Sequence, residues 1–442
     1  MRFDRRILAI VAVAAGLGCS FDAAAAPTRI EFFFPVPVEG QLAKEMTNMV
    51  KRFNTAQSEV EAVAVYTGSY DDTKIKMQAA IAAGRPPGVV LTSANFVLEY
   101  KLNDQIAPLE PLLAADGTDR VKFLEDFWPA LHANATVDGN LYAIPFQNST
   151  PLVYYNADLL KEAGFDHAPV DWAELIAMAT KLTKKSGGNT EVWGLMMPQT
   201  YDYCGWLFSA FTMLNGGQYF NPVYGGEVYY DAPSTLGAMR LYDDAVHKYG
   251  FLPGSVTDAK EVSSSFFAGK AAMVIMSTGS LSFVRDNAKF KYGVAFLPRN
   301  VRNAAPIGGG SLVMPKDLPD DQRKAAWSFM TWLSAPEQLA SWSRFTGYFA
   351  PRKSAYELPE MKQFTAEHPE ALIALQQLLK FGQPWFATFN TVGVRQAMED
   401  QVQAVLTGKK KPEQAVKDAQ RAADEIMKPY VDSTAGALTH GG

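Results

Sequence analysis

Cysteine and histidine are scarce in this chain of 442 residues, which has two cysteines and five histidines. Cys19 falls in an N-terminal segment that we expect to be removed, so Cys204 would be the single thiol and no intramolecular disulfide could form. The histidines are scattered without metal-ligand spacing, and the chain has neither a His-Glu-x-x-His nor a Gly-x-Ser-x-Gly motif. We therefore expect no metal, no cofactor and no enzymatic activity, and a secreted hydrolase is kept only as a remote alternative.

Basic clusters and long apolar runs are also missing. No block or stripe of Lys and Arg is present and the formal net charge is −5, which argues against nucleic acid as a partner. Beyond the N-terminus, no apolar run reaches the ~18 residues that a membrane span needs. The hydrophobic fraction of 48% is ordinary for a globular protein, and the length suggests two or three domains.

Residues 1–25 have the features of a secretory signal peptide. Arginines form a positively charged start, a short apolar core follows, and the alanines at 23–26 supply the small residues of a cleavage site. We place cleavage after Ala25. Gly16 stands where a lipoprotein signal usually has an aliphatic residue, so lipidation of Cys19 is the minority interpretation. The sequence therefore predicts a protein exported to the periplasm.

Strand and helix patterns alternate in the N-terminal part of the mature chain. Strand-like apolar runs cover 29–34, 60–66 and 88–92, with a helical pattern over 42–53 and another that Gly84 ends. This β-α-β-α-β order predicts an α/β fold with a parallel sheet and right-handed crossovers. In such a sheet, ligands bind beyond the carboxyl ends of the strands.

Residues 145–156 contain two strand-like runs joined by a polar insert at 147–150. These residues alone fit either an ordinary turn, since Asn, Ser and Pro favour turns, or a strand that crosses from one domain into another. An α/β pattern continues on the C-terminal side, and a second polar cluster at 277–280 follows another apolar run. Both features favour the crossing.

Several further segments carry a resemblance to a known family. They are residues 68–70, 145–156, 277–281, 291–294, 308–312, 346–348, 395 and 407–415. Together with the signal peptide, they make the chain resemble the extracytoplasmic solute-binding proteins of bacterial ABC importers. Within the maltose-binding-like group of that family, it resembles the glycerol-3-phosphate binders. The resemblance spans nearly the whole mature chain.

The resemblance implies a periplasmic-binding-protein-like fold of type II, with two discontinuous α/β lobes around a ligand cleft that closes by hinge motion. We expect crossings within 145–156, at 277–280 and near 334–338. The expected boundaries are a signal peptide at 1–25, lobe 1 at 26–147 and 280–335, lobe 2 at 148–279 and 336–435, and a flexible tail at 436–442.

A small phosphorylated polyol needs hydroxyl and backbone N–H donors, a guanidinium and an aromatic wall. The resemblance implies that the ligand-binding residues are Tyr70, Ser149, Trp206, Ser280, Gly309, Tyr348 and Arg395. The two serines match phosphate-contacting positions, and Gly309 would offer a bare backbone N–H group. The two tyrosines would line the cleft, Trp206 would form the stacking wall, and Arg395 would clamp the oxyanion.

Each of these assignments has a structural alternative. The serines could be turn or N-cap residues, Gly309 could serve a backbone with positive φ, and Trp206 could pack in a core. Arg395 precedes Glu399 and Asp400, so the alternative to an oxyanion clamp is a surface ion pair with these carboxylates.

One position departs from the pattern of the glycerol-3-phosphate binders. Where these proteins tend to have a glutamate after the third strand, this chain has Ala94. A carboxylate there would accept hydrogen bonds from glycerol hydroxyls, and either Ser93 or Asn95 could compensate for its loss. A larger glycerophosphodiester and a neutral sugar or oligosaccharide are therefore kept as alternative ligands.

The sequence as a whole predicts a monomeric binding component of an ABC importer. It would take sn-glycerol-3-phosphate between two lobes and deliver this small molecule to the transmembrane permease subunits. A signalling receptor or adhesin would require an interaction surface that no sequence feature identifies.

Overall fold

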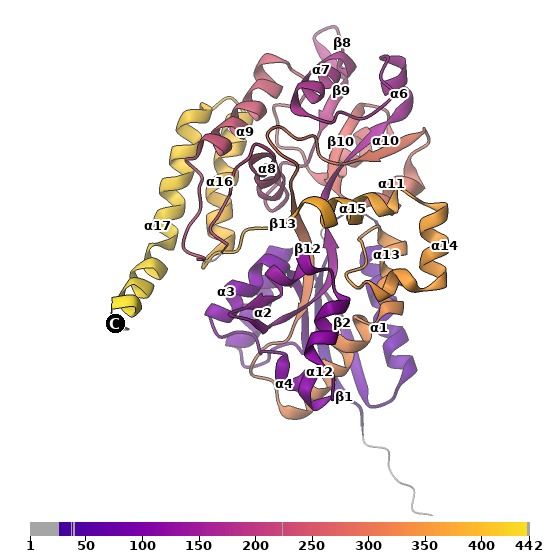
Figure 1. The fold of residues 1–442 in the computed structure, drawn as a ribbon, viewed down its shortest axis with the longest axis vertical. Coiled ribbons are helices and arrows are strands. Elements are labelled where there is room, and N and C mark those ends of the chain that lie inside the picture. Colours follow the sequence, from indigo (N-terminus) through magenta and orange to yellow (C-terminus); the bar gives the residue numbers. More distant parts are fainter. Residues whose placement is uncertain (1–25, 37, 39, 223, 440–442) are drawn as a thin grey trace, which may run out of the picture.

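The computed structural model describes residues 26–36, 38, 40–222 and 224–439. The predicted signal peptide and Cys19 lie outside these residues. The described chain forms two large β-sheets with helices packed around them, and one small sheet of two strands. Figure 1 shows the first sheet and its helices in the lower half of the molecule and the second sheet in the upper half.

The first sheet has the strand order β13-β12-β3-β1-β2, and β6 pairs with β12 beside this path. Its strands are β1 (Thr28–Pro35), β2 (Val60–Gly68), β3 (Val89–Ser93), β6 (Ala143–Ser149), β12 (Ala305–Val313) and β13 (Gly382–Pro384). As predicted, β1 runs parallel to both β2 and β3, whereas β12 is antiparallel to β3 and β6. The carboxyl ends of β1, β2 and β3 therefore meet at one edge.

The second sheet has the strand order β11-β7-β10-β9-β8. Its strands are β7 (Pro151–Asn156), β8 (Lys184–Ser186), β9 (Asn189–Met196), β10 (Ala271–Ser277) and β11 (Tyr292–Ala295). β10 is antiparallel to β7 and parallel to β9. The small sheet pairs β4 (Thr136–Val137) with β5 (Asn140–Leu141).

The segment at 145–156 crosses from one sheet to the other. β6 ends at Ser149, opposite Gly308 of the first sheet, and β7 begins at Pro151, opposite Ser277 of the second sheet. Thr150 alone separates the two strands. The prediction of a crossing is therefore confirmed, and Ser149 lies at the junction.

Helices pack around both sheets and also form one side of the molecule (Figure 1). They are α1 (Leu42–Ala56), α2 (Tyr70–Ala82), α3 (Val97–Leu102), α4 (Glu110–Ala115), α5 (Arg120–Asp126), α6 (Ala157–Glu162), α7 (Trp172–Leu182), α8 (Tyr203–Leu214), α9 (Pro233–Asp243), α10 (Ala259–Phe267), α11 (Leu281–Asn287), α12 (Asp320–Leu333), α13 (Pro336–Thr346), α14 (Pro359–Glu367), α15 (Ala371–Phe381), α16 (Thr391–Leu406) and α17 (Pro412–Thr439). Four short 3₁₀-helices are η1 (Ala94–Phe96), η2 (Pro129–Asn134), η4 (Thr278–Ser280) and η5 (Ser354–Glu357), and η3 (Asp244–Lys248) is a turn of π-helix.

Two elements, β11 and α13, lie in a different half of the molecule from the one that the expected lobe boundaries assign to them. β11 pairs with β7 in the second sheet, so the chain returns to the first sheet at β12 rather than at 277–280. The turn at 277–280 forms because Ser277 Oγ accepts a hydrogen bond from the Gly279 N–H, and α11 follows it directly. α13 was expected in lobe 2, yet its Leu339 and Trp342 pack in the core around the first sheet.

The glycines at 308–310 lie inside β12, where all three pair with β6 and Gly310 also pairs with β3. The predicted flexible tail at 436–442 stays a prediction: α17 continues to Thr439, and residues 440–442 lie outside the described ones.

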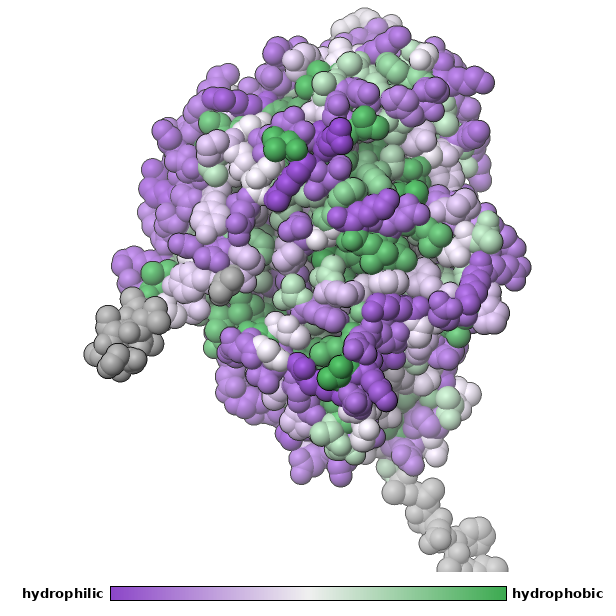
Figure 2. All heavy atoms as spheres, viewed as in Figure 1, coloured by the Kyte–Doolittle hydropathy of each residue, from purple (hydrophilic) through white to green (hydrophobic). Residues whose placement is uncertain are grey.

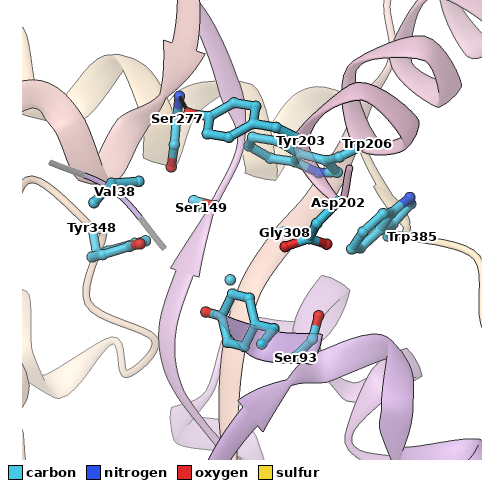
Figure 3. Close-up of a pocket in the computed structure, with 12 residues that line it drawn as sticks. Val38, Ser93, Ser149, Asp202, Tyr203, Trp206, Ser277, Gly308, Tyr348 and Trp385 are labelled. Carbon is cyan, nitrogen blue, oxygen red and sulfur yellow. Dashed lines mark hydrogen bonds between the residues drawn. The ribbon is translucent and has the colours of Figure 1, made fainter. Parts of the chain in front are cut away.

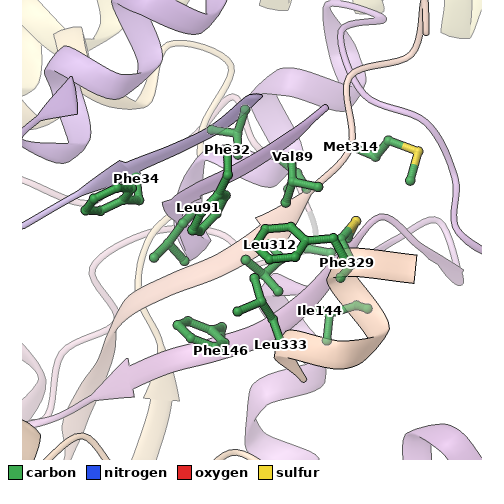
Figure 4. Packing of buried hydrophobic residues seen from close by; sticks show 14 of the residues in the cluster. Phe32, Phe34, Val89, Leu91, Ile144, Phe146, Leu312, Met314, Phe329 and Leu333 are labelled. Carbon is green, nitrogen blue, oxygen red and sulfur yellow. The ribbon is translucent and has the colours of Figure 1, made fainter. Parts of the chain in front are cut away.

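The largest apolar cluster packs the first sheet against α12 (Figure 4). Phe32, Leu91 and Leu312 come from neighbouring strands and are fully buried, and the ring of Phe329 meets that of Phe32 edge-on at a centroid distance of 5.2 Å. Each such buried side chain stabilises the fold by about 1.5–3 kcal/mol. Two further clusters surround the second sheet, so each half has its own core.

The face drawn in Figure 2 is mostly hydrophilic at its edges, and hydrophobic residues gather across its middle. Of the helices in the described ranges, none combines the length and the apolar character that a membrane crossing requires.

Candidate functional site

A pocket lies where the two halves of the molecule meet, beside the crossing at Ser149 (Figure 3). It contains about 390 Å³ of empty space, its mouth included. The lining residues are Val38, Tyr70, Ser93, Ser149, Asp202, Tyr203, Trp206, Ser277, Gly308, Gly309, Tyr348 and Trp385. Ser93 ends β3 and Tyr70 follows β2, so the pocket adjoins the carboxyl ends of parallel strands, where the sequence predicts a ligand.

Five of the seven predicted ligand-binding residues line this pocket, namely Tyr70, Ser149, Trp206, Gly309 and Tyr348. Ser280 and Arg395 are buried behind it. Ser280 interacts with the hydroxyl of Tyr203, and Arg395 contacts the carboxylate of Asp202. The structure therefore brings all seven residues to one place, with five in the wall and two behind it.

A capping box positions Tyr70 at the start of α2. The Ser69 hydroxyl accepts a hydrogen bond from the Asp72 N–H at 3.1 Å, and the Asp72 carboxylate accepts one from the Ser69 N–H at 2.9 Å. Gln147 donates a hydrogen bond from Nε2 to the Tyr70 hydroxyl at 2.9 Å. Burial raises the pKa of Tyr70, so the phenol stays neutral and can donate its own proton to a ligand.

Two glycines of β12 allow close approach of the backbone to the pocket. Gly309 has a φ of +86°, and a Cβ there would lie 1.9 Å from the carbonyl oxygen of Gln147. A Cβ on Gly308 would lie 2.6 Å from the ring of Trp206. The steric explanation for Gly309 is therefore correct, and it is compatible with a ligand against the same backbone.

Two buried indole groups in the pocket wall lack a hydrogen-bond acceptor. Nε1 of Trp206 and Nε1 of Trp385 have no partner, although both residues are more than nine-tenths buried. Leaving such a donor unsatisfied costs about 1–3 kcal/mol. Trp206 meets Tyr203 edge-on at a centroid distance of 5.8 Å, and Figure 3 shows Asp202 between the two tryptophans. The indole N–H groups of Trp172 and Trp342 are also unpaired away from the pocket, so the two donors in the pocket wall are open to an acceptor from a ligand but do not require one.

Arg395 is the centre of a buried cluster of charges. Its Nε donates to Glu399 at 3.3 Å, its Nη1 donates to Asp202 at 3.1 Å, and its Nη2 donates to Asp71. The alternative of an ion pair with the following carboxylates is therefore confirmed for Glu399, but this pair is buried, with the Arg395 side chain 0% exposed, and Asp400 binds Tyr201 instead. Asp71 lies on α2 and Arg395 on α16, so the cluster also joins the two halves of the molecule.

Asp202 is electrostatically and conformationally unusual. Burial raises its pKa to about 7; Arg395 opposes this rise, while Asp71 and Glu399 add to it. Its φ of 72° and ψ of −54° lie in a strained γ-turn region, which costs of order 1–3 kcal/mol for a residue other than glycine. Burial also raises the pKa of Glu399. In the described part of the chain, no group of three or more His, Cys, Asp or Glu residues is arranged to hold a metal ion.

The region of Ala94 shows which neighbour can replace the expected glutamate. The Ser93 hydroxyl faces the pocket and donates to Oδ1 of Asn95 at 2.6 Å. Nδ2 of Asn95 donates to the carbonyl oxygen of Phe386 at 3.1 Å, so this amide joins the two halves instead of lining the pocket. Ser93 is therefore the better candidate for a ligand contact.

Seven of the twelve lining residues are not among the predicted ligand-binding residues: Val38, Ser93, Asp202, Tyr203, Ser277, Gly308 and Trp385. Ser277 lies in the polar cluster that the sequence already singled out. Asp202 precedes a helical pattern, and Asp before a helix is a known start signal that could have drawn attention to it. Nothing in the local sequence marks Trp385, because only the tertiary fold brings it to the pocket.

The model of the family described as bacterial extracellular solute-binding protein matches residues 48–370 of this chain. The chain is 28% identical to the sn-glycerol-3-phosphate-binding periplasmic protein UgpB of Pectobacterium atrosepticum, over 97% of this chain and 98% of that protein. It is also 28% identical to UgpB of Escherichia coli K12, over 96% and 98% of the two chains.

Solved structures share the same architecture. UgpB from Mycobacterium tuberculosis in complex with glycerophosphocholine has a TM-score of 0.79 at 23% identity, covering 92% of this chain and 100% of the other. Maltose-bound MalE3 of T. maritima has a TM-score of 0.78 at 23% identity, covering 90% and 99%. These structures are maltose-binding-like solute-binding proteins of type II, which confirms the predicted fold class.

The family match covers well over half of the chain, and the relatives are substrate-binding transport proteins. The pocket between two sheets, each with its own core, is consistent with that role. The chain belongs to the bacterial extracellular solute-binding protein family and is a solute-binding protein of the ABC-transporter type.

Proposed function

We propose that this protein binds sn-glycerol-3-phosphate, or one of its phosphodiesters, in the periplasm and delivers it to ABC permease subunits. The observation that carries the proposal is the pair of unpaired, buried indole N–H donors of Trp206 and Trp385 in the pocket wall. The hydroxyls of Ser149 and Ser277 lie in the same wall. An ionised phosphodiester presents only acceptor oxygens at its phosphate and therefore matches a wall rich in donors.

A sugar hydroxyl could accept the same hydrogen bonds, so the choice of a charged ligand depends on Arg395. We assign this residue the role of oxyanion clamp, with one of its carboxylate partners giving way to the phosphate. The relatives in P. atrosepticum and E. coli are named for glycerol-3-phosphate, which supports this choice. Structural neighbours with bound sugars keep the neutral sugar as the alternative ligand.

A specific observation favours a phosphodiester over glycerol-3-phosphate itself. A second cavity of about 880 Å³ of empty space, its mouth included, is lined by Ala94 and Pro384, which are the sequence neighbours of the pocket residues Ser93 and Trp385. Ala94 occupies the position where the resemblance leads us to expect a glutamate. The short side chain leaves room for the second alcohol of a glycerophosphodiester.

A thermal-shift panel tests the proposal. The mature protein would be heated with sn-glycerol-3-phosphate, glycerophosphocholine, maltose and trehalose in turn. A ligand at a hundredfold excess over its Kd stabilises the folded state by about 2.7 kcal/mol, so one of the phosphates should raise the Tm clearly. A shift with a sugar and none with either phosphate would refute the phosphate assignment.

A further inference from the structure

Asp202 is the one charged residue among the pocket-lining residues that the structure describes. Its Oδ1 accepts from Nη1 of Arg395 at 3.1 Å, so this carboxylate stands between the guanidinium and the pocket. The other two carboxylates of the cluster, Asp71 and Glu399, do not line the pocket. An anion that reaches Arg395 from the pocket must therefore meet Asp202 first.

We propose that Asp202 competes with an anionic ligand for Arg395, and that this residue sets both the affinity for anions and its dependence on pH. The inference rests on the proposed function, since it concerns the choice among ligands of the same pocket. Asp202 shares the pocket wall with Trp206 and Trp385, whose indole N–H groups have no acceptor. A ligand phosphate placed there would repel an ionised Asp202 and be attracted by Arg395.

The charged and titratable groups that face Asp202 come from three helices. α16 contributes Arg395 and Glu399, α2 contributes Asp71 and Tyr70, and α8 contributes Tyr203. Burial raises the pKa of both tyrosines, so these groups stay neutral near pH 7. Arg395 stays charged. Burial raises the pKa of Asp202 to about 7 and also raises that of Glu399, and of these two carboxyls only Asp202 lines the pocket.

The direction of the effect follows from these charges. Below about pH 7 the Asp202 carboxyl is protonated and leaves Arg395 available to an anion. Above that pH, an anion binds only with uptake of a proton or displacement of the carboxylate. Affinity for an anion should then fall about tenfold for each further pH unit.

Calorimetric titration of the mature protein with glycerophosphoglycerol tests this proposal, because a phosphodiester keeps one negative charge between pH 6 and 8. The titrations compare wild type, Asp202→Asn and Asp400→Asn. Asp400 is a neighbouring exposed carboxylate that binds Tyr201 rather than Arg395, so its variant controls for the change in net charge. Asn tolerates positive φ, and Asp202→Gly supplies a second variant that fits the backbone with no side chain.

Wild type and Asp400→Asn should bind about tenfold more weakly at pH 8 than at pH 6. Asp202→Asn should bind with the same affinity at both pH values within about twofold, and about tenfold more tightly than wild type at pH 8. Weaker binding by both Asp202 variants, or a wild type with no pH dependence, would overturn the proposal.

The outcomes also separate this proposal from the proposed function. Binding by Asp202→Asn without binding by wild type would support the competition and refute the proposed ligand for the natural protein. Binding by wild type, with affinity of the Asp202 variants at pH 8 equal to or weaker than that of wild type, would refute the competition alone. Binding by none of the proteins would refute both.

Discussion

Three carboxylates surround the buried guanidinium of Arg395, so its removal leaves only negative charge inside the molecule. Arg395→Ala should lower the free energy of unfolding by about 3–5 kcal/mol, which urea denaturation measures. Arg395→Lys keeps the charge but loses the planar fork, so its main effect should be on ligand affinity, with a loss of about 1.5–3 kcal/mol in calorimetry. Stability and binding can thus be measured separately at one position.

The control for Arg395 is Arg240, whose ion pair with Glu413 is more than half exposed on both sides. Arg240→Ala should change the unfolding free energy by less than about 1 kcal/mol. If Arg395→Ala has an effect as small as this control, the buried cluster does not stabilise the fold. If Arg395→Lys binds the phosphate ligand as tightly as wild type, Arg395 has a structural role alone.

The backbone conformation at position 309 requires glycine, and the substitution Gly309→Ala tests this requirement. The positive φ strains any other residue, and the new methyl group would meet the carbonyl oxygen of Gln147 across the β6–β12 pairing. We expect a loss of about 2–4 kcal/mol in unfolding free energy. Gly269→Ala is the matched control, since Gly269 has a φ of +69° with nothing within 4 Å, and should lose only about 1 kcal/mol. Equal losses would show that the contact with Gln147 is unimportant.

At the level of elements, local patterns predicted the first strands and helices of the mature chain. The run at 60–66 lies within β2 and the helix at 42–53 lies within α1. These features depend on neighbours in the sequence, namely the apolar periodicity. Local information was therefore sufficient for them.

Long-range features were harder to predict. The placement of β11 and α13 depends on which sheet or core they pack against, and a segment's own residues do not specify this. The resemblance predicted Tyr70, Ser149 and Tyr348 as site residues, and all three line the pocket. Asp202 and Trp385 were missed because their positions follow from tertiary contacts, and the three carboxylates around Arg395 could not be seen before the helices were assembled.

A second set of buried polar contacts, centred on Glu99, joins α3 to the first turn of α16. Glu99 accepts a hydrogen bond from Nζ of Lys74 at 2.5 Å and one from the N–H of Thr391 at 3.1 Å. Both charged side chains are 7% exposed, so Lys74→Met leaves an unpaired carboxylate in the interior. The variant should lose about 3–5 kcal/mol of unfolding free energy in urea. Lys122→Met, at an exposed position, is the control and should stay within about 0.5 kcal/mol of wild type. If both variants lost the same unfolding free energy, the contacts of Glu99 would not stabilise the fold.

On the scale of the whole molecule, contacts between the two halves surround the pocket. Arg395 donates a hydrogen bond to Asp71, and Asn95 donates one to the carbonyl oxygen of Phe386. Nearby, Glu99 accepts one from the N–H of Thr391. A ligand in the pocket would touch both halves at once, so binding energy can favour the arrangement in which these contacts form. The polypeptide itself connects the halves at Thr150, next to Ser149 in the pocket wall.

The central claim is that the pocket takes a glycerol phosphate, and calorimetric titration of the mature protein at pH 6 tests it most directly. We predict saturable binding of one sn-glycerol-3-phosphate or glycerophosphodiester per chain, with no measurable heat from glycerol or maltose under the same conditions. Saturable binding of maltose, together with no binding of either phosphate, would contradict the account.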